Sequence, residues 1–289
     1  MIASMTSPRL RSLTCVALVM SCLGVRPRPS LAQDASLYSQ TAAATLERNF
    51  HDASLSWLLL DRSGNVVAKR WTNSEQPIPP GSLVKPFVAL SYGEQHDFAY
   101  PHVRCKGSGG KCWLPSGHGR LGLEQAIAQS CNDYFWSLAR DMDRDRATGT
   151  FRRFGLTGPN RNAKDETLIG LDDGWRETPL LLARAYLELI QESQQGARKR
   201  IVTGMSASAQ KGTARGVDSA LGTGAALAKT GTTACSHPAG GAADGFAVVL
   251  YPSGQPRFVL LVCRHGTTGA QAAVVAGAML HSLGMGEPR

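Results

Sequence analysis

Ser82 and Lys85 are the pair of side chains in this sequence best placed for nucleophilic chemistry. They lie in the segment PPGSLVKP, residues 79–86, ahead of an apolar run with helical spacing. Two prolines and a glycine end any preceding element, so we expect Ser82 at or beside a helix N-terminus. Residues three apart share one face of a helix, which places the Lys85 amine beside the Ser82 hydroxyl. A neutral amine can accept the hydroxyl proton, and the positive helix end favours the developing negative charge.

A second Ser-x-x-Lys pair, Ser208 and Lys211, shows that this spacing alone carries little weight. At ordinary composition such a pair occurs by chance about once in a chain of this length. Ser208 lacks the Gly-Ser-x-x-Lys-Pro context of Ser82. We therefore interpret Ser208 as a polar loop residue and look for the companions of Ser82 elsewhere.

A hydroxyl and an amide lie close together at Ser130 and Asn132, where one predicted helix ends and another begins. Side chains held in such a connection can pass a proton and bind a substrate amide. Serine and asparagine are also common helix caps, so this element gains its meaning only in company with others.

A cation and two hydroxyls follow at Lys229, Thr230 and Thr232, at the end of a predicted strand. A lysine and hydroxyls on a strand edge suit a substrate carboxylate. Gly231, between the two threonines, allows a ligand to approach the backbone closely. The sequence thus offers three short polar elements that only the fold can bring together.

The elements that must position these residues are strands near both chain ends with helices between them. An antiparallel sheet can include both sets of strands only if the middle of the chain is an insertion. We therefore expect an α/β (α+β) fold, with a five-stranded antiparallel sheet flanked by N- and C-terminal helices and an inserted all-helical subdomain. The sheet part covers 33–80 and 206–289, and the insert covers 81–205. The predicted strands are Leu55–Leu60, Val66–Trp71, Leu227–Thr232, Gly245–Tyr251 and Arg257–Cys263, and the flanking helices are Leu37–Phe50 and Gly269–Leu283.

Residues 1–32 have the pattern of a secretory signal peptide. Two arginines precede an apolar stretch, Leu13–Val25, and a small-residue cleavage site ends at Ala32. A retained membrane anchor is the alternative, although the apolar stretch is shorter than a bilayer span. A further alternative is a lipid anchor on Cys22, because the preceding residues loosely resemble a lipobox. We expect export across the inner membrane to the periplasm or cell envelope, with membrane attachment only if Cys22 is lipidated or the signal is retained.

Composition is that of an ordinary globular protein, 43% hydrophobic and 18% charged over 289 residues, which is enough chain for a sizeable core. The net charge of +9 includes four arginines of the predicted signal peptide. The mildly basic remainder suits an anionic envelope, and it lacks the clustered charge of nucleic-acid binding proteins. We expect no nucleic-acid partner.

Five cysteines lie beyond the predicted signal peptide. Cys105 and Cys112 are close in sequence within a glycine-rich loop, and in an oxidising compartment we expect them to form a disulfide. A zinc site is the competing interpretation, but no paired Cys-x-x-Cys or histidine stands at ligand spacing, so we expect no metal. His118 and His265 are the histidines in suggestive loops, and we interpret both as structural. The remaining cysteines are Cys131, Cys235 and Cys263.

Taken in order, the three polar elements resemble the motifs of penicillin-binding proteins and class A β-lactamases. Further blocks are similar to the transpeptidase domain of high-molecular-weight penicillin-binding proteins, and the similarity spans roughly Leu55 to Leu283. These blocks are Gly117-His118-Gly119, Ser130 to Phe135, Ile169-Gly170, Thr178-Pro179-Leu180 with Ala185-Tyr186, Gly204-Met205, Lys211 to Ala214, and Ala228 to Thr232.

The resemblance implies a role for each matching residue. Ser82 would be acylated by a D-Ala-D-Ala stem peptide of peptidoglycan or by a β-lactam, with Lys85 as general base. Ser130 would relay a proton to the leaving amine, and Lys229 would keep Lys85 neutral by like-charge repulsion.

Substrate contacts follow from the same resemblance. Asn132 would bind the substrate amide, Thr230 and Thr232 would contact the carboxylate, and Gly231 would let the substrate approach. The backbone N–H groups of Ser82 and Thr232 would form the oxyanion hole. No cofactor is implied, and other cell-wall synthesis proteins are possible partners.

Three functions remain open within this resemblance. The first is a D,D-transpeptidase or D,D-carboxypeptidase, and the second is a β-lactamase on the same fold. Glu166 lacks the Glu-x-x-Leu-Asn pattern of a deacylating glutamate, and we interpret it as a solvated loop residue. The third is a non-catalytic penicillin-binding sensor or scaffold.

Overall fold

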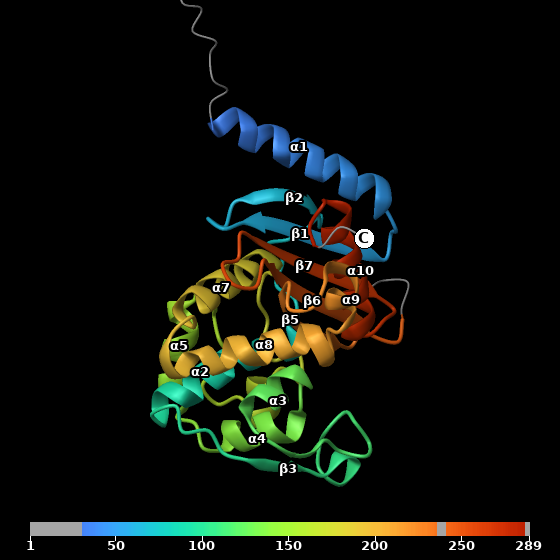
Figure 1. The fold of residues 1–289 in the computed structure, drawn as a ribbon. Coiled ribbons are helices and arrows are strands. Elements are labelled where there is room, and N and C mark those ends of the chain that lie inside the picture. Colours follow the sequence, from blue (N-terminus) through green and yellow to red (C-terminus); the bar gives the residue numbers. More distant parts are fainter. Residues whose placement is uncertain (1–30, 236–240, 287–289) are drawn as a thin grey trace, which may run out of the picture.

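A five-stranded antiparallel sheet forms the centre of the computed structural model, which describes residues 31–235 and 241–286, with side chains from residue 37 onward. The strand order is β2-β1-β7-β6-β5, so the N-terminal hairpin lies beside strands from the C-terminal part of the chain (Figure 1). The strands are β1 (Leu55–Asp61), β2 (Val66–Arg70), β5 (Leu227–Thr233), β6 (Asp244–Tyr251) and β7 (Phe258–His265).

Alternating side chains of the strands enter two separate hydrophobic cores. On β1, Leu58 and Leu60 enter one core, whereas Trp57 and Leu59 enter the other. Successive residues of a strand point to opposite faces, so a strand buried on both faces is apolar throughout. This explains why LSWLLL is apolar in the sequence at every position except Ser56.

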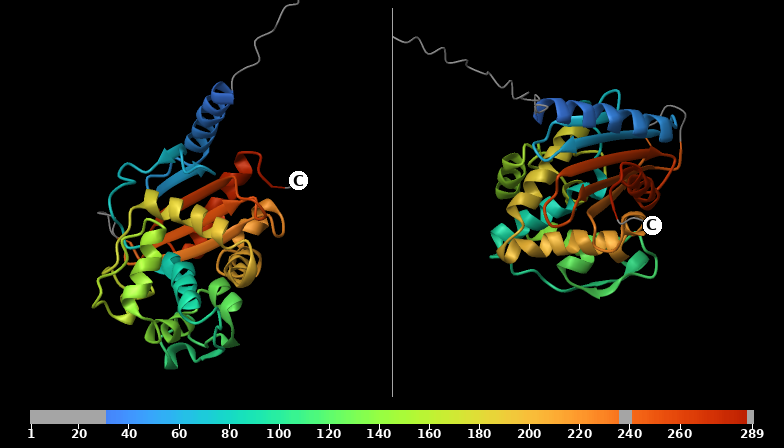
Figure 2. Two further views of the ribbon diagram at one scale, coloured as in Figure 1. Left: turned by 90° about the vertical axis from the view of Figure 1, so that its left-hand side faces the viewer. Right: turned by 45° about the horizontal axis from the view of Figure 1, so that its top comes forward.

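Helices from the two ends of the chain cover one face of the sheet. Helix α1 lies along the outer strand β2, α10 packs on β6, β7 and β5, and α9 packs against α10 (Figures 1 and 2). This core is built from small and aliphatic residues, which lets α10 lie close to the strands. The bounds are α1 (Leu31–Asn49), α9 (Gly216–Leu221) and α10 (Gly269–Ser282).

The middle of the chain covers the other face and forms the lower part of the molecule in Figure 1. It holds most of the helices and a two-stranded ribbon. The helices are α2 (Lys85–Gln95), α3 (Leu123–Ala128), α4 (Asn132–Arg140), α5 (Arg144–Arg153), α6 (Asp165–Leu168), α7 (Pro179–Glu192) and α8 (Lys199–Lys211), with short 3-10 turns η1 (Gly81–Val84), η2 (Gly107–Gly109) and η3 (Gly196–Arg198). The ribbon pairs β3 (Val103–Cys105) with β4 (Gly119–Leu121).

The sheet and its flanking helices confirm the predicted fold class. Two details differ. The insert is not all-helical, because β3 and β4 pair within it. The predicted boundary between 205 and 206 also falls inside α8, which runs without a break from Lys199 to Lys211.

The predicted signal peptide and Cys22 lie outside the described residues, apart from the last two positions, which begin α1. Within the described part of the chain, no helix combines the length and apolar character that crossing a bilayer requires.

Candidate active site

Ser82 lies in the 3-10 turn η1, and Lys85 begins the helix that follows. The Lys85 backbone N–H bonds to the Ser82 carbonyl, so the turn runs directly into α2. Leu83 and Val84 anchor the turn in the hydrophobic core, while the Ser82 side chain remains partly exposed. Ser82 therefore lies beside the start of a helix, as the sequence predicts.

The amine of Lys85 is fully buried and reaches across to the connection between α3 and α4. Its Nζ donates to the Ser130 carbonyl at 2.9 Å and to Asn132 Oδ1 at 2.6 Å. Ser130 has a left-handed backbone with φ of 50°, which is uncommon outside glycine and turns the chain sharply between the two helices. This bend brings both the backbone and the side chains of the connection to Lys85.

The second buried amine, Lys229, also contacts this connection. Its Nζ donates to Ser130 Oγ at 2.8 Å and to the Thr230 carbonyl at 2.7 Å. Lys229 is the third residue of β5, and its side chain points into the insert. Ser130 is therefore the residue through which the two lysines are connected.

Burial lowers the pKa of both lysines. It brings the pKa of Lys85 to about 8, although the neighbouring thiols of Cys131 and Cys112 act in the opposite direction. Burial, followed by the charge of Lys85, holds the pKa of Lys229 well below its usual range. The like-charge repulsion expected from the resemblance thus acts mainly on Lys229, and burial is the main reason that Lys85 can be neutral.

Strand β5 packs directly against the turn that carries Ser82. A Cβ atom on Gly231 would lie 3.2 Å from the Leu83 side chain and from the Pro80 carbonyl. A Cβ atom on Gly81, which has φ of +56°, would lie 2.9 Å from Thr233 and 3.4 Å from the Thr232 nitrogen. Glycine is needed at both positions because the two backbones approach so closely.

The remaining polar residues of the site already have partners within the chain. Asn132 Nδ2 donates to the Lys111 carbonyl at 3.2 Å. The Thr230 hydroxyl bonds to that of Thr213 at 2.6 Å, and the exposed Thr232 accepts the Gly269 N–H at 3.0 Å. These contacts fix the positions of the side chains that the sequence analysis assigned to substrate binding.

The structure therefore brings together the residues predicted from the three motifs. Ser82, Lys85, Ser130 and Asn132 form what we call the insert side, and Lys229, Gly231 and Thr232 form the strand side.

Two supporting residues were missed by the sequence analysis. The Tyr186 hydroxyl donates to the Leu83 carbonyl at 2.5 Å and so holds the turn. Thr213 bonds to Thr230 as described above. Both lie in blocks that carried the family resemblance, but no local pattern indicated their contacts.

Ser208 takes no part in this arrangement. It is fully buried within α8, and its exposed companion Lys211 ends the same helix. The interpretation of Ser208 as a loop residue was wrong, because the apolar positions of α8 continue through it. Its exclusion from the site stands.

The expected disulfide between Cys105 and Cys112 is not present. Both thiols are free, and each sulfur lies 3.5 Å from Nδ1 of His118. Cys105 ends β3 and His118 immediately precedes β4, so the pairing of the ribbon brings the histidine to the cysteine. Cys131 completes the group, with its sulfur 3.8 Å from that of Cys112.

We call Cys105, Cys112, His118 and Cys131 the thiol cluster. Their ligand atoms all lie within 4.8 Å of one another, and His118 Nε2 is buried without a hydrogen-bond partner. The contact with Cys131 lowers the pKa of Cys112 to about 4, so a thiolate is available there. Three sulfurs and one imidazole form a donor set that binds zinc tetrahedrally. The sequence spacing of these residues gave no sign of this grouping, because folding brings together side chains that the sequence separates.

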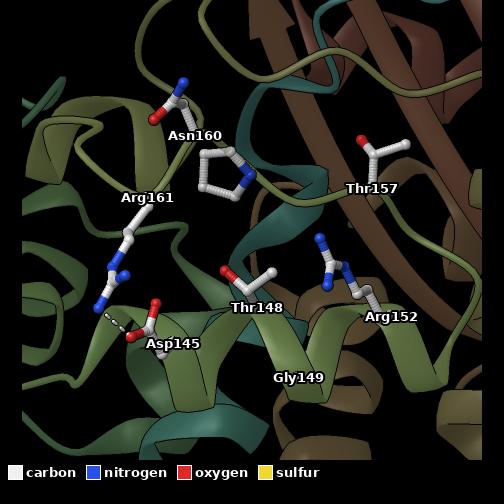
Figure 3. Close-up of a pocket in the computed structure, with 8 residues that line it drawn as sticks. Asp145, Thr148, Gly149, Arg152, Thr157, Asn160 and Arg161 are labelled. Carbon is white, nitrogen blue, oxygen red and sulfur yellow. Dashed lines mark hydrogen bonds and ion pairs between the residues drawn. The ribbon is translucent and has the colours of Figure 1, made fainter.

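A surface pocket of about 450 Å³ lies elsewhere, between α5 and the loop at 157–161 (Figure 3). Arg161 contacts Asp145 at its edge, and Arg152 faces the loop. None of its eight lining residues belongs to the insert side, the strand side or the thiol cluster.

The sheet with its inserted helices, and the two buried lysines that both contact Ser130, form the arrangement of a penicillin-binding transpeptidase domain. The family model named penicillin binding protein transpeptidase domain matches residues 52–282, and the chain belongs to that family.

The curated relatives that match this chain are peptidoglycan D,D-transpeptidases. The chain is 33% identical over 102 residues to peptidoglycan D,D-transpeptidase MrdA of Acinetobacter baumannii, a match covering 31% of this chain and 15% of the relative. It is 27% identical over 152 residues to MrdA of Haemophilus influenzae, covering 40% of this chain and 23% of the relative. The matches thus span less than a quarter of the length of these relatives.

Solved structures of the same family share the fold. The transpeptidase domain of Burkholderia pseudomallei penicillin-binding protein 3 superposes with a TM-score of 0.67 at 18% identity, covering 86% of this chain and 93% of that one. Penicillin-binding protein PBP2 of Helicobacter pylori gives 0.68 at 17% identity, covering 85% and 63%.

Proposed function

We propose that this protein is a serine D,D-peptidase that acylates Ser82 with peptidoglycan stem peptide and passes the acyl group to an amine or to water. The observation that carries the proposal is the double contact at Ser130, whose carbonyl accepts from Lys85 and whose hydroxyl accepts from Lys229. Family membership and the names of the MrdA relatives support the same reaction class.

The first step is attack by Ser82 Oγ on the carbonyl carbon of the penultimate D-alanine. Neutral Lys85 accepts the serine proton, which its lowered pKa permits near pH 8. The negative charge on the carbonyl oxygen is bound by the backbone N–H groups of Ser82 and Thr232, for which the close packing of Gly81 against Thr232 provides the support.

The second step expels the terminal D-alanine. The bond between the carbonyl carbon and the amine nitrogen breaks, and the nitrogen takes the proton of Ser130 Oγ. Ser130 recovers a proton from Lys85, so the lysine is again neutral and no net proton is gained. Lys229 holds the Ser130 hydroxyl in place at 2.8 Å. Asn132, Thr230 and Thr232 orient the substrate amide and carboxylate.

The acyl-enzyme is tested by mass spectrometry after treatment with a labelled penicillin. The unaltered protein should gain one penicilloyl group, and Ser82→Ala should gain none. Ser208→Ala is the matched control and should be acylated normally. A folded, unaltered protein that forms no adduct would contradict the proposal.

The rate at which the penicilloyl group is released separates the alternatives. Slow release supports a D,D-peptidase, whereas rapid turnover of a chromogenic cephalosporin would support a β-lactamase. Glu166 lies 3.4 Å from Lys111 in a solvent-exposed ion pair, an arrangement that does not favour a deacylating role. A sensor or scaffold would bind penicillin and keep its cellular role in Ser82→Ala.

We also infer the setting in which this reaction takes place. The stem peptide and its β-lactam mimics place the protein in the cell envelope, with residues 33–289 as one transpeptidase-like domain. A solved complex of Helicobacter pylori PBP2 with MreC supports other cell-wall proteins as partners. This setting is tested by comparing the incorporation of a labelled stem peptide into peptidoglycan in cells that carry the unaltered protein and in cells that carry Ser82→Ala.

A further inference from the structure

Two free thiols of the thiol cluster lie in contact directly behind the candidate active site. The sulfur of Cys112 is 3.8 Å from that of Cys131, whereas the sulfurs of a disulfide are about 2.0 Å apart. Cys131 stands between Ser130 and Asn132 in the chain, so a bond to its sulfur would act on both. We propose that Cys112 and Cys131 form a reversible disulfide, and that this modification slows the acylation of Ser82.

The burial of the two thiols sets the order in which they would react. Cys131 is fully buried, whereas Cys112 is 9% exposed and stands between the exposed Lys111 and Trp113. An external disulfide therefore reaches Cys112 first. Cys131 then acts as the resolving thiol, since its sulfur already contacts that of Cys112.

The reaction consists of two exchanges with an external disulfide, which is the oxidant. In the first exchange, the Cys112 sulfur attacks one sulfur of the external disulfide, and the other sulfur leaves as a thiol with the Cys112 proton. In the second, the Cys131 sulfur attacks the Cys112 sulfur of the mixed disulfide, and the remaining external sulfur leaves as a thiol with the Cys131 proton. The protein loses two protons and two electrons, and the external disulfide is reduced to two thiols.

The glycine-rich loop would pass a movement of Cys112 on to the start of α4. The two sulfurs must approach by about 1.8 Å, so at least one of the two cysteines has to move. Lys111, the neighbour of Cys112, is bonded to α4 at both ends of its backbone. Its N–H donates to Asp133 Oδ1 at 2.6 Å, and its carbonyl accepts from Asn132 Nδ2 at 3.2 Å. A shift of the loop toward Cys131 therefore disturbs Asn132.

A movement of Cys131 would act on the buried lysines. Its neighbours Ser130 and Asn132 accept the two hydrogen bonds of the Lys85 amine, at 2.9 and 2.6 Å, and the Ser130 hydroxyl accepts from Lys229. A misplacement of about 1 Å in a catalytic arrangement can cost about 10²-fold in rate. We therefore expect the disulfide to slow acylation by about 10- to 100-fold. This effect rests on the proposed function, whereas formation of the disulfide does not.

Peptide mapping tests the disulfide without any use of enzymatic activity. The full chain is reduced, freed of metal with a chelator, incubated with glutathione disulfide, alkylated and cut with trypsin. Trypsin places the two cysteines on separate peptides, 112–120 and 121–140. We expect these peptides to be linked, and to separate after reduction. Free thiols on both peptides, a persistent glutathione adduct on Cys112, or a bond from Cys112 to Cys105 would each overturn the proposal.

The rate of acylation by a labelled penicillin tests the consequence for the site. Glutathione disulfide should slow acylation of the unaltered protein by about 10- to 100-fold, and dithiothreitol should restore the rate. Cys112→Ser should show the same rate with and without the oxidant. Cys235→Ser, which changes a partly buried thiol just after β5, is the matched control and should respond as the unaltered protein does. Linked peptides with an unchanged rate would overturn the proposed control of acylation.

A second variant covers the case in which Cys112→Ser does not fold. Cys105→Ser keeps both proposed partners, so it should still form the linked peptides and lose rate on oxidation. Loss of either response in folded Cys105→Ser would assign the modification to Cys105 and overturn the proposed pairing. A reduced, unaltered protein that is not acylated would contradict the proposed function, and the peptide mapping would still decide whether the disulfide forms.

Discussion

The insert side and the strand side of the candidate site are built in different ways. Lys229, Gly231 and Thr232 belong to one strand, and the register of β5 against β6 sets their positions. Ser82 and Ser130 instead lie in turns between short elements, and Ser130 has a left-handed backbone. A regular sheet positions its residues without further help, whereas turns need additional contacts to hold them.

The additional contacts of the insert side are visible in the structure. Tyr186 bonds to the turn of Ser82, and Cys131 anchors the Ser130 connection to the thiol cluster. Asp133 accepts N–H groups from Lys106 and Lys111, which ties the glycine-rich loop to the same connection. The insert side therefore depends on cross-links from outside the catalytic residues, and the strand side should depend on them less.

The largest expected effect is that of Lys85→Met, which removes the proposed general base. Acylation by penicillin should fall by about 10³-fold or more, within the range for loss of a positioned base. Stopped-flow or quench measurements of adduct formation give the rate. Lys211→Met, in the second Ser-x-x-Lys pair, is the matched control and should retain the full rate.

The second-largest expected effect is that of removing the buried amine on the strand side. Lys229→Met removes the donor to Ser130 Oγ, and acylation should fall by about 10²-fold. The variant keeps the insert-side contacts of Lys85, so the loss should be smaller than for Lys85→Met. A larger loss in Lys229→Met would mean that the strand side holds the essential base.

The pH dependence of acylation provides a third test. Lys85 must be neutral to accept a proton, and its pKa is about 8 because of burial. The protonated form predominates below that pH, so the rate should rise with pH and level off above about 8. A rate that falls over this range would show that a protonated Lys85 is needed.

Much of this arrangement could be predicted from sequence because it depends on local patterns. Continuous apolar runs predict the strands, and Thr178-Pro179 predicts the start of α7, where the Thr178 hydroxyl accepts the Leu181 N–H. Helix α5 was missed because its sequence, RDRATGTFRR, is almost entirely polar and only Ala147, Thr150 and Phe151 are buried. The Asp143 side chain caps its first turn by accepting the Asp145 and Arg146 N–H groups, and the helix packs against α2.

The thiol cluster could not be predicted for a related reason. Its ligands are separated by 7, 6 and 13 positions, which match no familiar zinc spacing. Only the pairing of β3 with β4 and the bend at Ser130 bring them together. In the same way, the contact between Lys229 and Ser130 spans 99 positions and follows from the fold alone.

Loss of a thiolate from the thiol cluster should have a moderate effect on the insert side. Cys112→Ser removes a negative charge that raises the pKa of Lys85, so the pH midpoint of acylation should move below that of the unaltered protein. The rate at high pH should fall by about tenfold as the Ser130 connection loosens. Cys235→Ser is the matched control on the strand side, and its midpoint should not move. Equal midpoints in Cys112→Ser and the unaltered protein would show that the cluster is electrostatically independent of Lys85.

The smallest expected effect on acylation concerns the link between Tyr186 and the turn of Ser82. Tyr186→Phe leaves the buried Leu83 carbonyl without its partner, which should lower the free energy of unfolding by about 1–3 kcal/mol in denaturant titrations. Acylation should also slow by a few-fold, because the turn that carries Ser82 gains freedom. Tyr100→Phe is the matched control, since Tyr100 donates a similar bond to the Ala89 carbonyl on α2, away from the turn. If both variants lose stability and only Tyr186→Phe loses rate, the bond acts by positioning Ser82. Equal rates in the two variants would show that the insert side holds its nucleophile without this cross-link, and the contrast with the strand side would then rest on Ser130 alone.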